Sequence, residues 1–199
     1  MTNEIRPAII LLLLFTLLTG IAYPFGMTGL GGLLFPRQAA GSLIFRNGQV
    51  IGSEIIGQAF SRPGYFHGRP SATTGLDDKG TSVAQPYNAA NSMGSNLGPT
   101  SKSLIDRIRA ETAKLAAENP DRPVPVDLVT TSASGFDPDI TPAGALFQIR
   151  RIAAARHLDP GKIEKLVGQF TKPRTLGIIG EPTVNVLKLN MALDAMAQK

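Results

Sequence analysis

The feature that most constrains this chain is an apolar run near its N-terminus, from Ala8 to Tyr23. No charged residue lies between Arg6 and Arg37. A helix needs about 20 apolar residues to cross about 30 Å of hydrocarbon, and lipid offers the backbone no other hydrogen-bond partners. The run is slightly shorter than that, and the uncharged residues after it can supply the missing turns. We therefore predict a membrane helix over about residues 6–28, within an anchor segment of residues 1–28.

A cleaved signal peptide is the alternative interpretation of the same run. Gly20 and Ala22 place small residues at the two positions that a signal peptidase recognises. However, the basic region that should precede the apolar core is weak, because Glu4 offsets Arg6. The run also lacks the polar periodicity of a buried amphipathic helix. These observations favour a retained anchor.

Composition limits what the rest of the chain can do. The 199 residues leave enough sequence after the anchor for one domain with its own core. The net charge of +5 belongs to that part, because residues 1–36 hold one charge of each sign. Its bases are scattered and only 6% of the residues are aromatic, so we expect a solvated basic surface and no nucleic-acid site. The absence of cysteine excludes disulfides, thiol catalysis and cysteine-ligated metal.

The chain after the anchor predicts an α+β fold, with a single mixed soluble domain over residues 41–199. Residues 29–40 are rich in glycine and proline, which predicts a juxtamembrane linker with little helix. Asn47-Gly48 between two apolar runs predicts a short hairpin, because both turn residues must take positive φ. Residues 61–99 are dense in Gly, Pro, Ser and Asn, and their aromatic residues favour a long shaped loop over disorder.

The remaining sequence predicts about four helices and a strand at residues 126–131. The first helix covers residues 100–118, where apolar residues recur at helical spacing and Ser103 with Asp106 resembles a capping box. The other three share one device, which is a capping or acidic residue before a proline at the first helical position. Those pairs are Thr141-Pro142, Asp159-Pro160 and Glu181-Pro182.

Signs of catalysis are sparse. The phosphate-binding loop, the nucleophile elbow and the paired-histidine zinc helix are absent from the sequence. His67 lies in the long loop and could act as a base or ligand, whereas His157 fits a helix C-terminus. Residues 77–81 suit an exposed turn better than an aspartyl-phosphate site. Asp137 and Asp139 fit the start of a helix better than a cation site, because two carboxylates bind metal weakly.

A series of short motifs runs along nearly the whole chain. They are Gly57–Phe60, Tyr65-Phe66, Arg69–Ala72, Gly94–Pro99, Asp127–Val129, Ser132–Gly135 with Asp137-Pro138, Gln148 with Arg151, Ala155-Arg156 and Gly180–Asn190. Each motif is weak alone. Together and in this order, they resemble the C subunit of the Kdp high-affinity potassium-transporting P-type ATPase complex.

The resemblance implies a non-catalytic accessory subunit of an ATP-driven potassium uptake complex. Such a subunit stabilises the assembly and covers the potassium entrance, and the family is described as a catalytic chaperone that raises the ATP affinity of the pump subunit. The implied partners are a channel-like potassium-binding subunit, the ATP-hydrolysing P-type subunit, in some cases a small single-helix subunit, and membrane lipid. ATP and potassium would be handled by those partners, with no cofactor bound directly by this chain.

The resemblance also implies a place in the cell and a docking surface. It implies a bacterial inner-membrane protein with a cytoplasmic N-terminus and a soluble domain on the outer side. Binding residues concentrate in loops, so we expect the loops to carry the docking surface. The candidates are Tyr65, Phe66, Arg69, Ser71, Ser95, Asn96, Ser134, Asp137 and Asn185, and we expect no catalytic or metal-binding residue. The alternative is a free-standing anchored or secreted hydrolase that uses His67 with Asp77 or Asp137.

Overall fold

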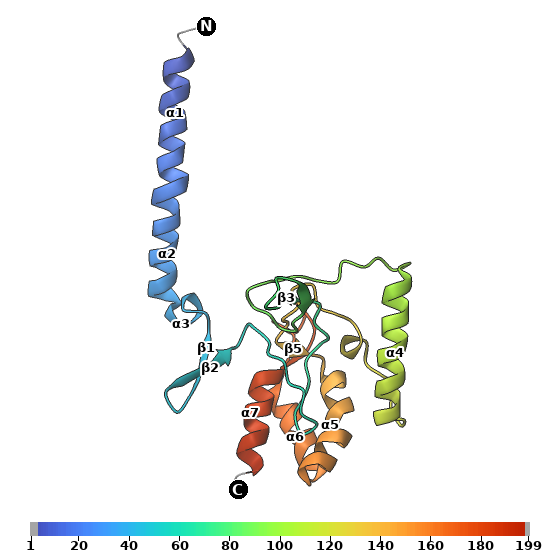
Figure 1. Ribbon diagram of the computed structural model, residues 1–199. Coiled ribbons are helices and arrows are strands. Elements are labelled where there is room, and N and C mark those ends of the chain that lie inside the picture. Colours follow the sequence, from blue (N-terminus) through green and yellow to red (C-terminus); the bar gives the residue numbers. More distant parts are fainter. Residues whose placement is uncertain (1–3, 198–199) are drawn as a thin grey trace. The chain divides into compact units, whose positions relative to one another are not determined.

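The computed structural model describes residues 4–197 and divides into two compact units (Figure 1). The first unit ends at Ser53 and the second begins at Glu54. The predicted fold class is confirmed, since a long apolar helix precedes an α+β domain with small antiparallel sheets.

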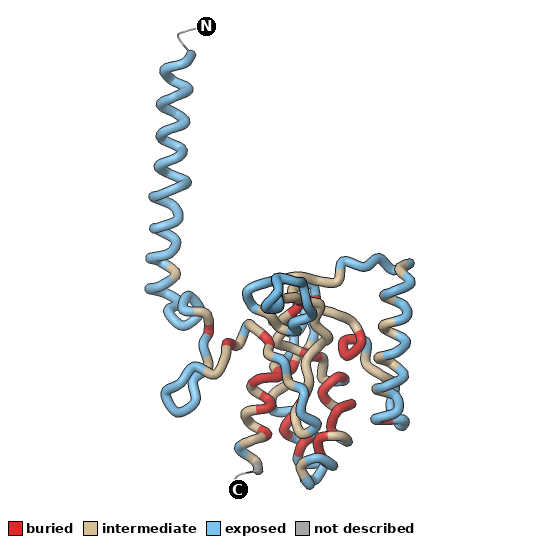
Figure 2. Tube along the Cα trace, viewed as in Figure 1, coloured by how far each residue is buried: buried red, intermediate tan, exposed pale blue. Residues whose placement is uncertain are grey.

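The first unit is dominated by one continuous helix of 30 residues, Ile5–Leu34. It comprises α1 (Ile5–Leu17), a π-helical turn (Leu18–Ala22) and α2 (Tyr23–Leu34). Its most apolar window has a mean hydropathy of 2.3, so the helix is long and apolar enough to cross a membrane. Figure 2 shows that nearly all of its residues are exposed.

The π-helical turn lies directly before Pro24. Proline has no amide hydrogen for the carbonyl four residues earlier, which here belongs to Gly20, and its ring crowds that carbonyl. A π-helical turn widens the helix at this point, as expected where the regular bonding pattern is interrupted. The helix therefore continues past the proline.

The glycine-rich segment is helical, which corrects the prediction of little helix at residues 29–40. α2 reaches Leu34, and a short helix α3 (Pro36–Ala39) follows it. Glycine disfavours a helix by about 1 kcal/mol per residue, whereas an unpaired backbone group in hydrocarbon costs several kcal/mol. The second effect is the larger one in an apolar segment, so the helix persists.

The predicted Asn-Gly hairpin is confirmed. Strands β1 (Leu43–Arg46) and β2 (Gln49–Ser53) pair antiparallel around Asn47 and Gly48, whose φ angles are 52° and 78°. Both turn residues thus take the positive φ that a two-residue turn of this kind requires. The Ser53 hydroxyl closes the base of the hairpin by donating to the Gly41 carbonyl at 2.7 Å.

The core of the second unit is built by three helices, α5 (Pro142–Arg156), α6 (Pro160–Phe170) and α7 (Val186–Ala197). They pack with an antiparallel sheet in the order β5 (Asp139–Ile140), β7 (Thr183–Asn185), β6 (Thr171–Lys172). Figure 2 shows the buried residues concentrated on these helices. The most deeply buried apolar side chains are Phe66, Ile152, Ile163, Val167, Val184, Leu189 and Leu193.

Two of the three predicted proline starts are confirmed by their caps. The Thr141 hydroxyl accepts from the Gly144 amide at 2.9 Å, and the Asp159 carboxylate accepts from the Lys162 amide at 3.0 Å. The third prediction is wrong, because Pro182 precedes β7 and α7 begins only at Val186. There the Asn185 side chain accepts from the Lys188 amide at 3.1 Å, so asparagine caps the helix.

Two further local predictions need correction. Helix α4 (Lys102–Glu118) begins after Ser101, so the proposed capping box of Ser103 and Asp106 lies inside it. The predicted strand at residues 126–131 is instead a single 3-10 turn, η3 (Val126–Leu128). Its Asp127 is buried and accepts from the Thr141 amide at 2.7 Å, and this tertiary contact overrides the strand preference of the valines.

The long loop is shaped and packed, as predicted, and it contains a hairpin that the sequence did not suggest. Strands β3 (Thr74–Leu76) and β4 (Ser82–Ala84) pair around the turn at residues 77–81. The Asp77 carboxylate accepts from the amides of Lys79 and Thr81 at 2.9 and 2.8 Å. This confirms the exposed turn.

Candidate docking site in the loop layer

Three irregular segments of the second unit hydrogen-bond to one another and form what we call the loop layer. It comprises residues 57–73, 85–96 and 130–139. The Gly57 amide donates to the Phe136 carbonyl at 2.8 Å, and the Gln85 amide donates to the Thr73 carbonyl at 3.0 Å. The Met93 amide donates to the Ser134 carbonyl at 3.1 Å, so each segment bonds to another.

Two buried amide side chains fix the first segment to the core helices. Asn190 on α7 accepts from the Phe66 amide at 2.8 Å and donates to the Phe66 carbonyl at 2.9 Å. Gln148 on α5 likewise accepts from the His67 amide at 2.8 Å and donates to the His67 carbonyl at 3.1 Å. Each amide replaces the partner that a neighbouring strand would supply. The Phe66 side chain is fully buried, so it anchors the loop and offers no surface for docking.

Tyr65 lies in a second anchoring cluster. The Arg156 guanidinium stands 4.4 Å from the centre of the Tyr65 ring and forms an ion pair with Asp194 at 2.8 Å. The Tyr65 hydroxyl donates to the same carboxylate at 3.3 Å. The phenol is therefore held between α5 and α7, with its ring 5.7 Å from that of Phe60.

Arg69 and Asp137, both predicted site residues, come together as an ion pair of 3.1 Å. The other terminal nitrogen of Arg69 donates to the Thr130 hydroxyl and the Thr131 carbonyl at 3.4 and 3.3 Å. One arginine thus joins the first and third segments. The Asp137 carboxylate also accepts from the Asp139 amide at 3.1 Å, ahead of the helix, whereas Thr141 caps α5, so Asp137 does not have the capping role expected of it.

A network of hydroxyl groups joins the first and second segments. The Ser71 hydroxyl accepts from the Tyr87 amide at 3.0 Å and lies 2.9 Å from that of Thr73. The buried Thr73 hydroxyl donates to the Gln85 carbonyl at 2.6 Å. Tyr87 in turn donates to the Arg69 carbonyl at 2.7 Å. Burial, together with the nearby Asp137 charge, raises the pKa of the Tyr87 phenol to about 12, so it stays a donor.

Gly135 lets the segments approach closely. Its φ is +80°, and a β-carbon there would lie 2.6 Å from the Met93 carbonyl oxygen and against the Thr73 methyl group. The left-handed backbone and the lack of space both require glycine.

The remaining predicted residues divide by location. Ser95 and Ser134 belong to the loop layer, where the Ser95 hydroxyl accepts from Thr131 at 3.3 Å. Asn96 is exposed at its edge with a φ of 52°. Asn185 lies apart, at the start of α7, and donates to the Glu54 carbonyl at 2.9 Å.

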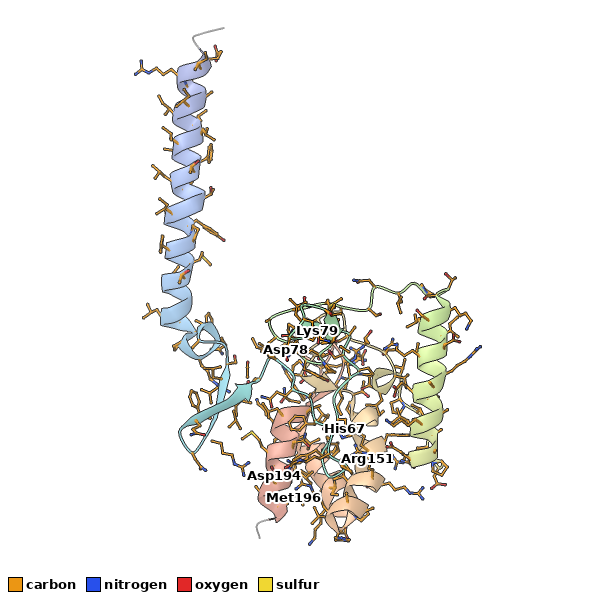
Figure 3. All side chains as sticks on the ribbon, viewed as in Figure 1. His67, Asp78, Lys79, Arg151, Asp194 and Met196 are labelled. Carbon is orange, nitrogen blue, oxygen red and sulfur yellow. The ribbon has the colours of Figure 1, made fainter. Side chains whose placement is uncertain are left out.

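A cleft of about 440 Å³ lies between the loop layer and α4, and His67 and Arg151 line it (Figure 3). Burial, followed by the nearby Arg151 charge, lowers the pKa of the His67 imidazole. The ring nitrogen Nε2 of His67 lies 3.1 Å from the Arg62 carbonyl. Burial also lowers the pKa of Arg151, whose guanidinium is held by the Pro63 and Tyr65 carbonyls.

The hydrolase alternative required His67 to act with Asp77 or Asp137. Asp77 is bonded within its turn, and Asp137 is paired with Arg69. Both carboxylates are therefore engaged elsewhere. Across residues 4–197, no three histidine or acidic side chains gather closely enough to hold a metal ion.

Asn190 and Gln148 belong to motifs of the resemblance, but their role in ordering the loop layer, like that of Thr73, was not predicted from the sequence. Asn190 follows Val186, Leu187 and Leu189 on the buried side of α7. A polar residue inside an apolar helical stripe is the signal that could have identified it, because such a group must find an internal partner.

Comparison with known proteins agrees with these motifs over almost the full chain. The family described as "K+-transporting ATPase, c chain" matches residues 5–195. A "Potassium-transporting ATPase KdpC subunit" of Rhodopseudomonas palustris (strain BisB18) is 62% identical over 98% of this chain and 99% of its own length. Proteins with the same description from Methylobacterium nodulans and Bradyrhizobium diazoefficiens are each 59% identical over the full length of both chains. The chain therefore belongs to the KdpC family, the c chain of the potassium-transporting ATPase.

Proposed function

We propose that this chain is a membrane-anchored, non-catalytic accessory subunit whose loop layer docks onto a partner and covers the potassium entrance. The observation that carries the proposal is that these irregular segments are held in a fixed conformation. Asn190, Gln148 and Arg69 hold them by long-range polar contacts, while Asn96 stays exposed at their edge. A preordered loop surface loses less conformational entropy on binding than a flexible one.

The partners proposed are the channel-like potassium-binding subunit and the ATP-hydrolysing pump subunit, with the small single-helix subunit where present. The first helix, Ile5–Leu34, anchors the chain in the bacterial inner membrane with its N-terminus in the cytoplasm and the second unit outside. ATP then contacts the pump subunit alone. Any increase in ATP affinity arises through assembly, because coupling between distant sites needs only a difference in binding free energy.

The test is co-purification of the tagged full chain with the other subunits. We expect the double variant Arg69→Ala and Asn96→Ala to retain about tenfold less partner, equivalent to about 1.4 kcal/mol. Asn96→Gly alone separates docking from folding, because Asn96 is exposed and glycine tolerates its left-handed backbone. Lys79→Ala, in the exposed turn, is the matched control and should retain partner normally.

Potassium-stimulated ATP hydrolysis by the same preparations provides the second measurement. Loss of the subunit should lower the rate at limiting ATP more than at saturating ATP. An intact and fully active complex carrying the double variant would contradict docking through the loop layer.

A further inference from the structure

The loop between β6 and β7, residues 173–182, exposes an unusual amount of apolar side chain. Leu176, Ile178 and Ile179 are 84%, 76% and 59% exposed. We call this segment the tip loop. Single exposed aliphatic residues are common, but three within four positions at the end of one loop form a patch that points to an interaction.

The tip loop is ordered by its own backbone. Thr175 and Ile179 exchange two hydrogen bonds of 2.9 Å each. The Gly177 amide donates to the Arg174 carbonyl at 3.1 Å, and the Ile178 amide donates to Thr175 at 3.2 Å. These amides are already paired, so the aliphatic side chains can enter a dry surface without leaving them unsatisfied.

The conformation of the tip loop is also specific. Leu176 has a φ of 54° and Gly177 a φ of 77°, both in the left-handed region. A leucine in this region costs roughly 1–2 kcal/mol relative to its usual backbone conformation. Such strain persists only where the surroundings enforce it, and it is typical of functional loops. Arg174 closes the base of the loop by donating to both carboxylate oxygens of Glu181 at 2.6 Å.

Charge favours a protein partner over lipid. Arg174 and Glu181 are the charged residues of the tip loop and neutralise one another, and no aromatic residue lies in it. Loops that bind membranes use clustered bases and interfacial aromatics. Lipid also imposes no particular shape, whereas a protein pocket selects a fixed one. The electrically neutral, preformed tip is therefore complementary to an uncharged apolar pocket.

We propose that the tip loop inserts Leu176, Ile178 and Ile179 into an uncharged apolar pocket on another protein subunit of the complex. This inference rests on the proposed accessory function and adds a second contact, separate from the loop layer. The Arg174–Glu181 pair serves as the positioning element at the base of the loop.

The absence of cysteine from the chain provides a direct test. The variant Ile178→Cys, labelled with a polarity-sensitive fluorophore, is measured in the reconstituted complex and as the full chain alone in lipid nanodiscs. We expect a blue-shifted emission and at least fivefold lower iodide quenching in the complex only. Lys79→Cys, in the exposed turn, is the control and should be quenched equally in both samples.

Each other outcome overturns the inference. Protection in nanodiscs without partners, with quenching by brominated lipid, assigns the loop to the membrane. Equal iodide quenching in both samples leaves the loop in water. If the unlabelled chain fails to co-purify with partners at all, the proposed function itself fails, whereas a normal complex with an accessible tip contradicts this inference alone.

A second variant guards against a perturbing label. Leu176→Ser combined with Ile178→Ser should weaken retention in the complex at least tenfold without changing the folded domain. Glu181→Gln should weaken it less, because it loosens the base of the loop and leaves the side chains in place. Retention equal to the unsubstituted chain in both variants contradicts insertion.

Discussion

The loop layer and the tip loop are both irregular backbone, but they are ordered in different ways. The loop layer depends on side chains from distant elements, such as Asn190, which lies 124 positions after Phe66. The tip loop depends on bonds between neighbours, such as Thr175 and Ile179. One is an extension of the core, and the other is a local turn held by an ion pair.

This difference has a consequence for stability. Contacts that cross the core should make the loop layer unfold together with the domain, since its anchors are buried. The tip loop can change without affecting the core, because its side chains contact mainly solvent. Substitutions in the loop layer should therefore lower the free energy of unfolding much more than substitutions in the tip loop.

The largest effect is expected from Asn190→Ala. It leaves the Phe66 amide and carbonyl buried without partners, and each such group costs about 1–3 kcal/mol. We expect the free energy of unfolding of the detergent-solubilised chain to fall by about 3 kcal/mol, measured by denaturant titration. Gln169→Ala removes an exposed amide from α6 and should change it by less than about 0.5 kcal/mol. Similar values for both would show that the loop layer is not tied to the core.

Gly135→Ala should cause the next largest loss of stability. Alanine there combines a left-handed backbone with collisions against Thr73 and the Met93 carbonyl, so we expect a loss of about 2–4 kcal/mol. Gly80→Ala is the matched control, because its φ is +75° and its added β-carbon meets nothing within 4 Å. That variant should lose only about 1 kcal/mol. Thermal unfolding of the two variants measures how much the close packing around Gly135 contributes to stability. Equal losses in Gly135→Ala and Gly80→Ala would show that this packing contributes nothing.

His67 should make folding stability depend on pH, by less than the losses expected from the two preceding variants. Its folded-state pKa lies below the unfolded value of about 6.5, so the unfolded chain binds the proton first as the pH falls. Stability should be unaffected by this group above about pH 7.5 and should decline as the pH drops through 6.5. His67→Gln should flatten the decline in thermal unfolding measured between pH 7.5 and 5.5. An unchanged slope would exclude His67 as its source.

The smallest effect is expected from the tip loop. Leu176→Ser with Ile178→Ser should change the free energy of unfolding by less than about 0.5 kcal/mol, because both side chains are exposed. Denaturant titration of the same preparation checks this. A loss above 2 kcal/mol would mean that the tip loop belongs to the core, and the comparison between the two regions would fail.

Local sequence signals predicted the elements whose causes are local. Asn47-Gly48 specified its hairpin, and Thr141 and Asp159 specified two helix starts. Glu181-Pro182 carried the same signal but precedes a strand, because pairing with residues 139–140 and 171–172 decides that segment.

The candidate site was predictable as a set of loops but not as an arrangement. Arg69 and Asp137 were both selected, yet their pairing across 68 positions depends on the fold. Phe66 was selected as a surface residue and is instead buried. Gln148 was recognised as part of a motif, but its role in holding His67 was not predicted, because an amide that faces inward has the same sequence signature as one that faces water.

The length of the first helix has a consequence for any bilayer that it spans. At about 1.5 Å per residue, its 30 residues span about 45 Å, whereas the hydrocarbon core is about 30 Å thick. This positive hydrophobic mismatch is relieved by tilt or by extension of the last turns beyond the hydrocarbon. Thicker bilayers should reduce the tilt, so the angle of this helix should respond to acyl-chain length.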